Sequence, residues 1–506
     1  MASTMAHLVP AARASRVALA PPAAPYRDGT RLIPPSSRWL LVPTVAFAAA
    51  IGALTALGPE KALAGLAVLI LAACVWKWPQ LAAYLVIGLT PLTVGISRGS
   101  ALPIVRPNEA IALLAGGTLA VRGLVQLRTG HLPRFRMDRV ELAIVLMAVS
   151  NSVLVLLWMT LRQEQITSDD VLYALVLWKT LGLYFLVRFS VRTDRQVLVC
   201  MWLSLAAASV VAALAILQAL GALGVPGLLN HFYESGITTA GLQNGRGSST
   251  LGLPAATADL MVFCLAILAG LWTRVRRHRT ILAAAAALFL LGALSAAEFS
   301  SAIGMVVGIV CIAIVLRKPR LLYVFVPGLL LAGFVLRSVI STRLSGFQSA
   351  SGLPASWTGR LQNLQSYFWP TLFSHGNFVL GVRPAARVVV PTQLTGYVWI
   401  ESGYTWLLWG GGIPLLASFI FFAYVTARRG WEAANDGPPG RSVAGVAVFT
   451  AIFVIIVLMT FDPHLTYRGS ADEFFFLLAL AAPVRPRANS APAKHKSPEL
   501  ATEVRR

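Results

Sequence analysis

The sequence predicts an all-α, polytopic integral membrane protein. Hydrophobic residues make up 57% of the 506 positions and charged residues only 12%, and the mean hydropathy is +0.71. This composition excludes an ordinary water-soluble core. Apolar runs of the roughly 20 residues that cross a hydrocarbon layer about 30 Å thick recur along almost the whole chain. A third observation, an uneven distribution of basic residues between the loops, fixes the predicted orientation.

The apolar runs predict about 14 transmembrane helices, with 12 as the lower bound because several runs are short. They lie near residues 39–57, 62–76, 79–96, 109–126, 140–160, 171–189, 196–220, 251–272, 280–297, 301–316, 321–340, 400–426, 442–460 and 471–484. The first eleven spans therefore occupy residues 39–340 and the last three occupy residues 400–484. Residues 341–399 separate the two groups.

The two ends of the chain are predicted to be disordered and cytoplasmic. Residues 1–38 are rich in Ala, Pro and Arg and have no short apolar core followed by a small-residue cleavage site, so we expect a leader that is retained. Residues 485–506 form a basic tail of similar character. The four cysteines, which all fall in predicted spans without metal-like spacing, are expected to pack as small apolar residues.

Loop charges predict that both termini face the cytoplasm. When the spans are threaded from a cytoplasmic N-terminus, the net charge of +22 falls entirely on the cytoplasmic side, as the positive-inside rule requires. The basic loops then face anionic membrane lipids, and the high isoelectric point needs no nucleic-acid partner.

Two charges lie deep in predicted spans. Lys179 and Asp259 are costly in hydrocarbon and are expected to face the protein interior or a wet cavity. A mutual ion pair is the simple interpretation, and a proton or ion relay is the functional one.

The longest predicted external segment covers residues 341–399. Within it, Trp357, Leu361, Leu364 and Phe368 recur at helical spacing and predict one apolar stripe on a helix that ends near Pro370. This amphipathic helix is expected either to lie on the outer membrane surface or to pack on the bundle.

Three segments resemble the bacterial O-antigen ligase and polysaccharide polymerase family. They are Asn244–Asp259, which leads into a span, Trp357–Leu361 with Pro370 and Gly381–Pro384 in the long loop, and Glu401–Pro414 at the start of the next span. The resemblance implies an enzyme of the bacterial cytoplasmic (inner) membrane. Its donor would be a polyprenyl-diphosphate-linked glycan, and its acceptor a saccharide or another hydroxyl compound.

The sequence departs from the family pattern at two places. Where ligases carry His before Asn, the same spacing from Gly412 reaches Glu401 and Ser402. Where many members have Ser-Arg, this chain has Ser300 and Ser301. The missing His weakens a ligase assignment and leaves a polymerase open.

Glycosyl transfer from a diphosphate requires groups that hold the diphosphate and orient an acceptor hydroxyl. Arginine suits the first task because its planar fork binds phosphate oxygens in a bidentate way. For each such arginine the alternative is an interfacial anchor that reaches to lipid headgroups. The candidate substrate-binding residues on the external side are Arg246, Arg360, Arg383, Arg468 and Arg98.

The reaction also needs a base for the hydroxyl proton. Glu401 starts a span next to aromatic residues, and His375 lies in the long loop, so both are candidate catalytic residues. Alternatively, Glu401 is a solvated helix-start residue and His375 an exposed loop residue.

Cofactor motifs and metal-ligand spacings are not found in the sequence, so we expect catalysis without a bound metal or cofactor. The predicted function is membrane glycosyl transfer on the outer face, with other envelope polysaccharide assembly proteins as further partners. A flippase or other secondary transporter is the main alternative, and a non-catalytic scaffold of an envelope-assembly complex is a third.

Overall fold

The computed structural model describes residues 59–98, 105–129, 137–233, 246–274, 278–320, 355–390 and 396–483, with isolated positions between 323 and 341. Contacts divide the chain into two units, residues 1–69 and 70–506, and helix α2 (Pro59–Lys77) crosses that boundary. The predicted leader, the first predicted span and the basic tail lie outside the described residues. Most of the span predicted at 321–340 lies outside them as well.

Helices occupy the other predicted spans. The described part of the chain is mostly helical, and seven of its helical segments are long and apolar enough to cross a membrane. A helical membrane protein is therefore supported, whereas the total of fourteen spans and the side of the termini remain predictions. The bounds are α3 Gln80–Thr93, α4 Pro107–Arg128, α5 Arg139–Val149, α6 Val155–Leu161, α7 Ser168–Ala174, α8 Val176–Ser190, α9 Asp194–Ala219, α10 Val225–Phe232, α12 Pro254–Arg274, α13 Arg279–Ser295, α14 Phe299–Val315, α19 Gly403–Asp436, α20 Pro439–Leu458 and α21 Ser470–Leu480.

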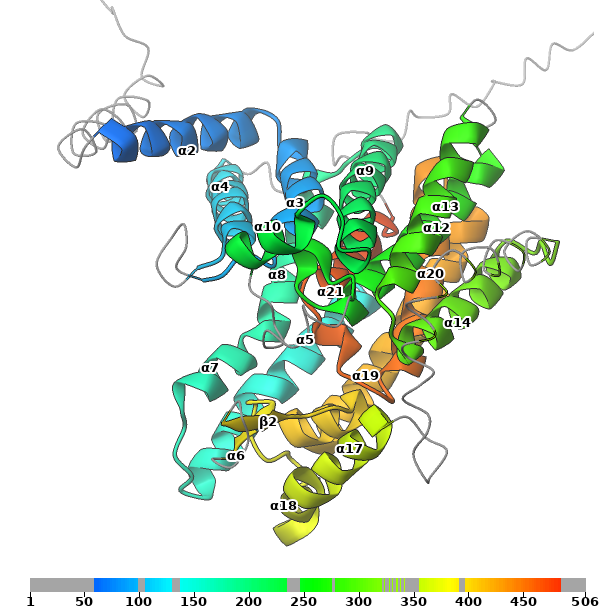
Figure 1. Ribbon diagram of the computed structural model, residues 1–506. Helices are drawn as coiled ribbons and strands as arrows, with labels where there is room; N and C mark the ends of the chain where they lie inside the picture. The colour runs from blue at the N-terminus through cyan, green and yellow to red at the C-terminus, as the bar shows by residue number, and fades with distance from the viewer. Residues whose placement is uncertain are drawn as a thin grey trace, which may run out of the picture. The chain divides into compact units, whose positions relative to one another are not determined.

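Helix α12 lies at the centre of the second unit. Every residue from Pro254 to Leu271 is buried, and α12 contacts α9, α13, α14, α20 and α21. Figure 1 shows these helices side by side. A helix that is apolar and covered on all sides belongs in the core of a bundle, so the one charge in its first half, Asp259, is held inside the protein.

Several helices begin at side-chain caps that the local sequence supplies. The Asp138 carboxylate accepts hydrogen bonds from the backbone amides of Val140 and Glu141 at the start of α5. Ser402 accepts one from the Thr405 amide at the start of α19. Such caps satisfy amides that have no partner within the helix, and they fix where each helix starts.

Helix α19 is broken near its start. Gly412 has φ +63° and ψ −154°, a conformation open to glycine but not to other residues, and a Cβ at this position would overlap the Val379 carbonyl. The Ile413 amide donates to the carbonyls of Phe378 and Val379 at 3.1 and 3.0 Å. The long loop therefore supplies backbone acceptors to a membrane-spanning helix.

A matching irregularity lies between α5 and α6. Residues Ser150–Leu154 form a π-helical turn, η1, that packs against α19. Added Cβ atoms on Gly410 and Gly411 would lie only 2.8 Å from Asn151 Oδ1 and the Ser150 carbonyl oxygen. The glycines thus allow the two helices to approach closely at this point.

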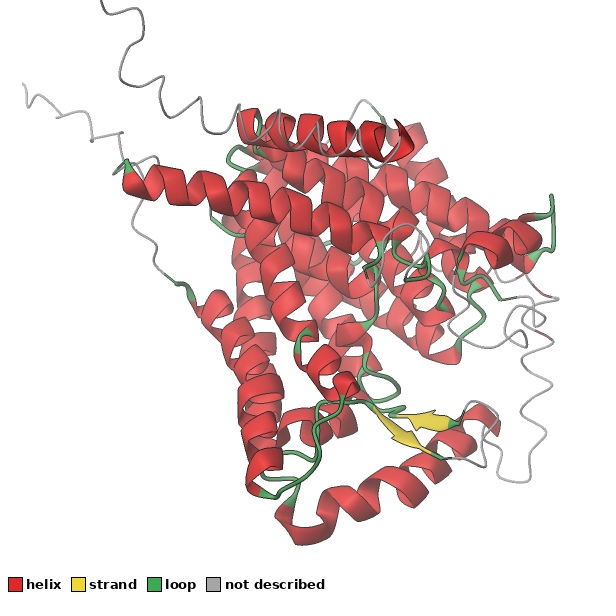
Figure 2. Ribbon diagram, turned by 90° about the vertical axis from the view of Figure 1, so that its left-hand side faces the viewer, coloured by secondary structure: helices red, strands yellow, loops and turns green. Residues whose placement is uncertain are grey.

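The long loop contains helices and a small sheet. Its described elements are α17 Ala355–Asn363, the π-helical turn η4 Leu364–Phe368, α18 Trp369–Phe373, η5 Ser374–Gly376 and the strands β1 Arg387–Val389 and β2 Tyr397–Trp399. Figure 1 shows α17, α18 and β2 at the same end of the molecule as α6, and Figure 2 shows the two strands side by side there. In the antiparallel register Val388 pairs with Val398. This small sheet was not predicted, and the rest of the described chain agrees with the predicted all-α class.

Only part of the predicted apolar stripe is buried in the structure. Leu364 and Phe368 are buried, whereas Leu361 is exposed, and the Phe368 and Trp409 rings pack with centroids 5.3 Å apart. The π-helical turn changes the register, and the helical path continues through Pro370 to Phe373. Packing on the bundle therefore accounts for the second half of the stripe, and the helical path ends at Phe373, close to the predicted end near Pro370.

Candidate active site

Five charged residues from distant parts of the chain meet where the long loop joins the helix bundle. Arg246, Glu298 and Glu401 precede helices, whereas Arg360 lies in the last turn of α17 and Asp462 in the turn before α21. The fold rather than the local sequence therefore brings these residues together. A buried histidine lies next to them. We call these residues the charged cluster: Arg246, Glu298, Arg360, Glu401, Asp462 and His464.

Arg246 is held at the start of a segment that leads into α12. Its Nη1 atom lies 3.3 Å from Glu298 Oε1. The Gly247 amide donates to the Ser295 carbonyl at 2.9 Å, and an added Cβ on Gly247 would lie 2.7 Å from the Ala215 carbonyl oxygen. The glycine after Arg246 thus lets the backbone pass between α9 and α13 and fixes the guanidinium beside Glu298.

Arg360 of α17 connects two carboxylates. Its Nη1 atom lies 2.6 Å from Asp462 Oδ2, and its Nε atom lies 3.8 Å from Glu401 Oε1. Asn363, one turn further along α17, donates to the other Glu401 oxygen at 3.1 Å. The amides of Gly403 and Tyr404 donate to the Met459 carbonyl, so the start of α19 and the end of α20 are joined beside the cluster.

His464 forms a buried pair with Asp259. The His464 Nδ1 and Asp259 Oδ2 atoms are 2.7 Å apart, and both side chains are almost fully buried. Among the described residues, His464 Nε2 has no hydrogen-bond partner. A carboxylate on one ring nitrogen orients an imidazole and stabilises its protonated form, so Asp259 positions His464 next to Asp462.

Burial and mutual charge shift several pKa values in the turn between α20 and α21. Burial raises the pKa of Asp462 to about 6, although the Arg360 guanidinium beside it acts in the opposite direction. Burial would lower the pKa of His464, but the carboxylates of Asp259 and Asp462 outweigh it and raise that pKa. Asp462 therefore gains or loses its charge close to neutral pH.

The predicted binding residue Arg383 lies outside the charged cluster. Its Nε and Nη2 atoms donate to Asp170 Oδ1 and Oδ2 at 3.0 and 2.8 Å, in a bidentate pair. Arg387 donates from Nε and Nη2 to a single oxygen of Asp169, Oδ2, and lies over the Tyr397 ring, 4.6 Å from its centroid. These two contacts, which we call the arginine clamp, fasten the second half of the loop to the start of α7.

Arg98 and His375 are also apart from the cluster contacts, whereas Arg468 belongs to the same turn as Asp462 and His464. Arg98 pairs with Glu109 at 3.4 Å, and Arg468 is exposed just before α21. His375 is exposed with φ +50° and makes no side-chain hydrogen bond or ion pair to any described residue. The structure therefore brings together Arg246, Arg360 and Glu401 from the predicted set.

The two intramembrane charges do not pair with each other. Lys179 Nζ lies 3.2 Å from Asp472 Oδ1, while Asp259 contacts His464. The expected mutual ion pair is wrong because α8 faces α21, whereas the start of α12 faces the turn that precedes α21.

Sequence reasoning missed Glu298, Asp462 and His464. All three fall in short turns that the threading places on the same side as the long loop. A signal was available there, since acidic residues and a histidine recur in turns of only a few residues next to apolar spans. Glu298 and Asp462 pair with arginines, and His464 pairs with Asp259, all more than 50 positions away in the chain, so these contacts leave no local pattern.

Within the described ranges, no group of three or more His, Cys, Asp and Glu side chains is arranged to hold a metal ion. Comparisons with protein-family models, with curated proteins and with solved structures gave no match.

Proposed function

We propose that the protein is a membrane glycosyltransferase that transfers or polymerises polyprenyl-diphosphate-linked saccharides. The proposal rests on one observation: Arg360 of the loop helix, Arg246 before α12 and Glu401 before α19 belong to one charged cluster. They are three of the candidate residues for donor binding and proton transfer in a chain that resembles O-antigen ligases and polymerases; Arg383, another of those candidates, pairs with Asp170 instead. The reaction takes place on the outer face of a bacterial cytoplasmic membrane, with both termini inside and about fourteen spans.

Donor binding is assigned to the two guanidiniums. A diphosphate that is esterified at both ends carries two negative charges, and arginine can pair with each phosphate through two parallel hydrogen bonds. Arg246 and Arg360 are each paired with a carboxylate in this structure. The incoming diphosphate replaces part of that contact, and it gains affinity when the carboxylate beside Arg360 is neutral.

Proton transfer is assigned to Glu401. The acceptor hydroxyl oxygen attacks the anomeric carbon, the bond from that carbon to the diphosphate oxygen breaks, and the diphosphate leaves as an anion held by arginine. The hydroxyl proton passes to the Glu401 carboxylate. Its Oε1 atom lies on the Arg360 side and Oε2 accepts from Asn363, so the carboxylate is oriented before the acceptor binds.

A secondary transporter, including a flippase, is the second candidate. Asp259, Asp472 and Glu473 are buried in helices of the bundle, and buried acids in membrane helices often mark proton pathways. The transporter assignment gives no role to the arginine and glutamate contacts of the loop helix, so we place it second.

Analysis of lipid-linked intermediates separates the two functions. A strain that lacks the protein should accumulate lipid-linked saccharide units on the outer leaflet and make shortened or unattached polymer, because transfer occurs after translocation. Accessibility of these units to an added glycosidase in spheroplasts measures the leaflet. Accumulation on the inner leaflet would instead identify a flippase.

A further inference from the structure

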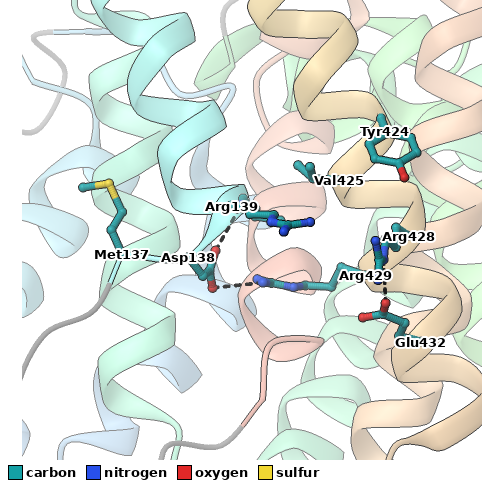
Figure 3. Close-up of a pocket in the computed structure, with 9 residues that line it drawn as sticks. Met137, Asp138, Arg139, Tyr424, Val425, Arg428, Arg429 and Glu432 are labelled. Atoms are coloured by element: carbon teal, nitrogen blue, oxygen red, sulfur yellow. Dashed lines mark hydrogen bonds and ion pairs between the residues drawn. The ribbon is translucent and has the colours of Figure 1, made fainter.

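A pocket opens on the face of the bundle opposite the long loop. It has a volume of about 330 Å³ and lies between the start of α5 and the second half of α19, as Figure 3 shows. Its charged lining consists of Arg139, Arg428, Arg429, Asp138 and Glu432. The position coincides with the basic face that the loop charges predict.

Three guanidiniums and two carboxylates leave this pocket with one positive charge in excess. Arg429 pairs with Asp138 at 3.0 Å and Arg428 with Glu432 at 2.7 Å. Arg139 is exposed and has no carboxylate partner among the described residues. Figure 3 shows its side chain pointing from α5 toward α19, above Arg429. The uncompensated charge therefore faces into the pocket.

The backbone amides at the start of α5 are not the source of the excess positive charge in the pocket. The Asp138 carboxylate already accepts hydrogen bonds from two of them. Asp138 also fixes Arg429, whose Nη1 atom lies 3.5 Å from the Tyr184 hydroxyl. The Arg429 side chain is thus held in place at one side of the pocket. Arg139 and Arg428 are exposed and can turn toward a ligand.

Apolar side chains continue from the pocket along both helices. Leu142 and Leu146 are exposed on α5, and Ile420 and Tyr424 are exposed on α19. In each pair the residues are four positions apart, so each pair lies on one helix face. An apolar surface that begins at a basic pocket on a membrane-spanning bundle fits a molecule with an anionic head and acyl chains.

We propose that this pocket binds an anionic phospholipid. The phosphate lies among Arg139, Arg428 and Arg429, and the acyl chains lie along the exposed leucines of α5 and Ile420 of α19. The lipid joins the two helices at the end of α19 that is far from the charged cluster. This inference is independent of the proposed glycosyl transfer.

Native mass spectrometry of the delipidated full-length protein tests the site. Phosphatidylglycerol and phosphatidylcholine with the same acyl chains are titrated separately, and phosphatidylglycerol is expected to bind more tightly. Arg139→Gln and Arg428→Gln should each weaken phosphatidylglycerol binding about fivefold, the usual effect of one basic residue near an anionic membrane surface. Arg128→Gln, an exposed arginine in the last turn of α4, is the matched control and should leave binding unchanged.

Three outcomes would overturn the proposal. Equal binding of the two lipids would show that the surface is merely apolar. An equal loss in the Arg128 and Arg139 variants would show a diffuse charge effect. Displacement of the lipid by inorganic phosphate at similar concentration, with the same dependence on Arg139, would identify a site for soluble phosphate.

Discussion

Asp462 and Glu401 share one guanidinium but differ in their access to solvent. The Asp462 side chain is 9% exposed and the Glu401 side chain 31%. A buried carboxylate beside an arginine serves to position it, whereas a base must reach the hydroxyl of an incoming acceptor. We therefore assign the positioning of Arg360 to Asp462 and proton transfer to Glu401.

Replacing the proposed base should abolish transfer without loss of donor binding. Glu401→Gln keeps the side-chain shape and the contact with Asn363 but cannot accept a proton, so the rate should fall by a factor of roughly one hundred to ten thousand. His375→Ala is the control and should be nearly silent, because that side chain is exposed. Polymer formation in vesicles that carry each variant measures the effect. Reversed results would move the base to His375, and full activity of both variants would favour a transporter.

Arg246 should contribute directly to donor affinity. Charge-assisted hydrogen bonds are worth about 1.5 to 3 kcal/mol each, so Arg246→Ala should weaken binding of undecaprenyl diphosphate by roughly tenfold or more. Arg246→Lys should restore only part of the loss because the bidentate geometry is absent. Arg98→Ala, which removes a pair with Glu109, is the matched control. Unchanged donor affinity in a correctly inserted Arg246→Ala protein would contradict the assignment.

Donor affinity should rise as the pH falls through about 6. The pKa of Asp462 is raised to about 6, so its carboxyl is ionised at pH 7.5 and mostly neutral at pH 5. Loss of that negative charge frees Arg360 for a diphosphate, whose own charge does not change over this range. We expect a gain on the order of tenfold, measured as the dissociation constant of undecaprenyl diphosphate. In the Asp462→Asn variant the affinity for undecaprenyl diphosphate should be high at both pH 7.5 and pH 5. If the variant instead shows the same pH dependence as the wild-type protein, the Asp462 carboxyl is not the group that titrates.

At the level of elements, the arginine clamp holds the loop through two unequal contacts. The Asp170 side chain is fully buried and that of Arg383 is 31% exposed, whereas both partners of the second pair are partly exposed. Removal of one member of a buried pair leaves an uncompensated charge, which costs far more than loss of a surface pair.

Arg383→Ala should therefore destabilise the protein by about 3 kcal/mol, near the low end for a buried pair because Arg383 is partly exposed. Arg387→Ala should cost about 1 kcal/mol, including its contact with the Tyr397 ring. Thermal unfolding in detergent measures both. The double variant Arg383→Ala with Asp170→Ala should recover part of the loss. If the two single variants are destabilised equally, the burial of Asp170 does not determine how much stability is lost.

Sequence analysis found the elements that depend on local composition. Apolar runs gave the described spans to within a few residues, except that α19 extends ten residues beyond its predicted end. The π-helical turns and the small sheet were missed because they depend on tertiary contacts, such as that between Ser150 and Gly411. Arg246, Arg360 and Glu401 were found through a family pattern, whereas Glu298, Asp462 and His464 required knowledge of which helix ends meet.

At the level of the whole molecule, the predicted orientation places the charged cluster outside and the lipid pocket inside. Thr371 and Asp436 are exposed and belong to α18 in the loop and to the end of α19, respectively. In a variant without the four native cysteines, Thr371→Cys should react with an impermeant thiol reagent in intact cells and Asp436→Cys only after the membrane is opened. The reverse pattern would invert the orientation.

The break in α19 restricts how this protein can be re-engineered. Trp409 and Ile413 exchange backbone hydrogen bonds with Val382 and Val379 of the loop, so the loop completes the bonding of a span that has few other partners in lipid. A chimera that grafts a foreign loop to change acceptor preference should therefore keep residues 378–382 from this chain. A graft that removes them would leave peptide groups of the span without partners, and the misassembled product would be exposed to quality-control proteolysis before its specificity could be measured.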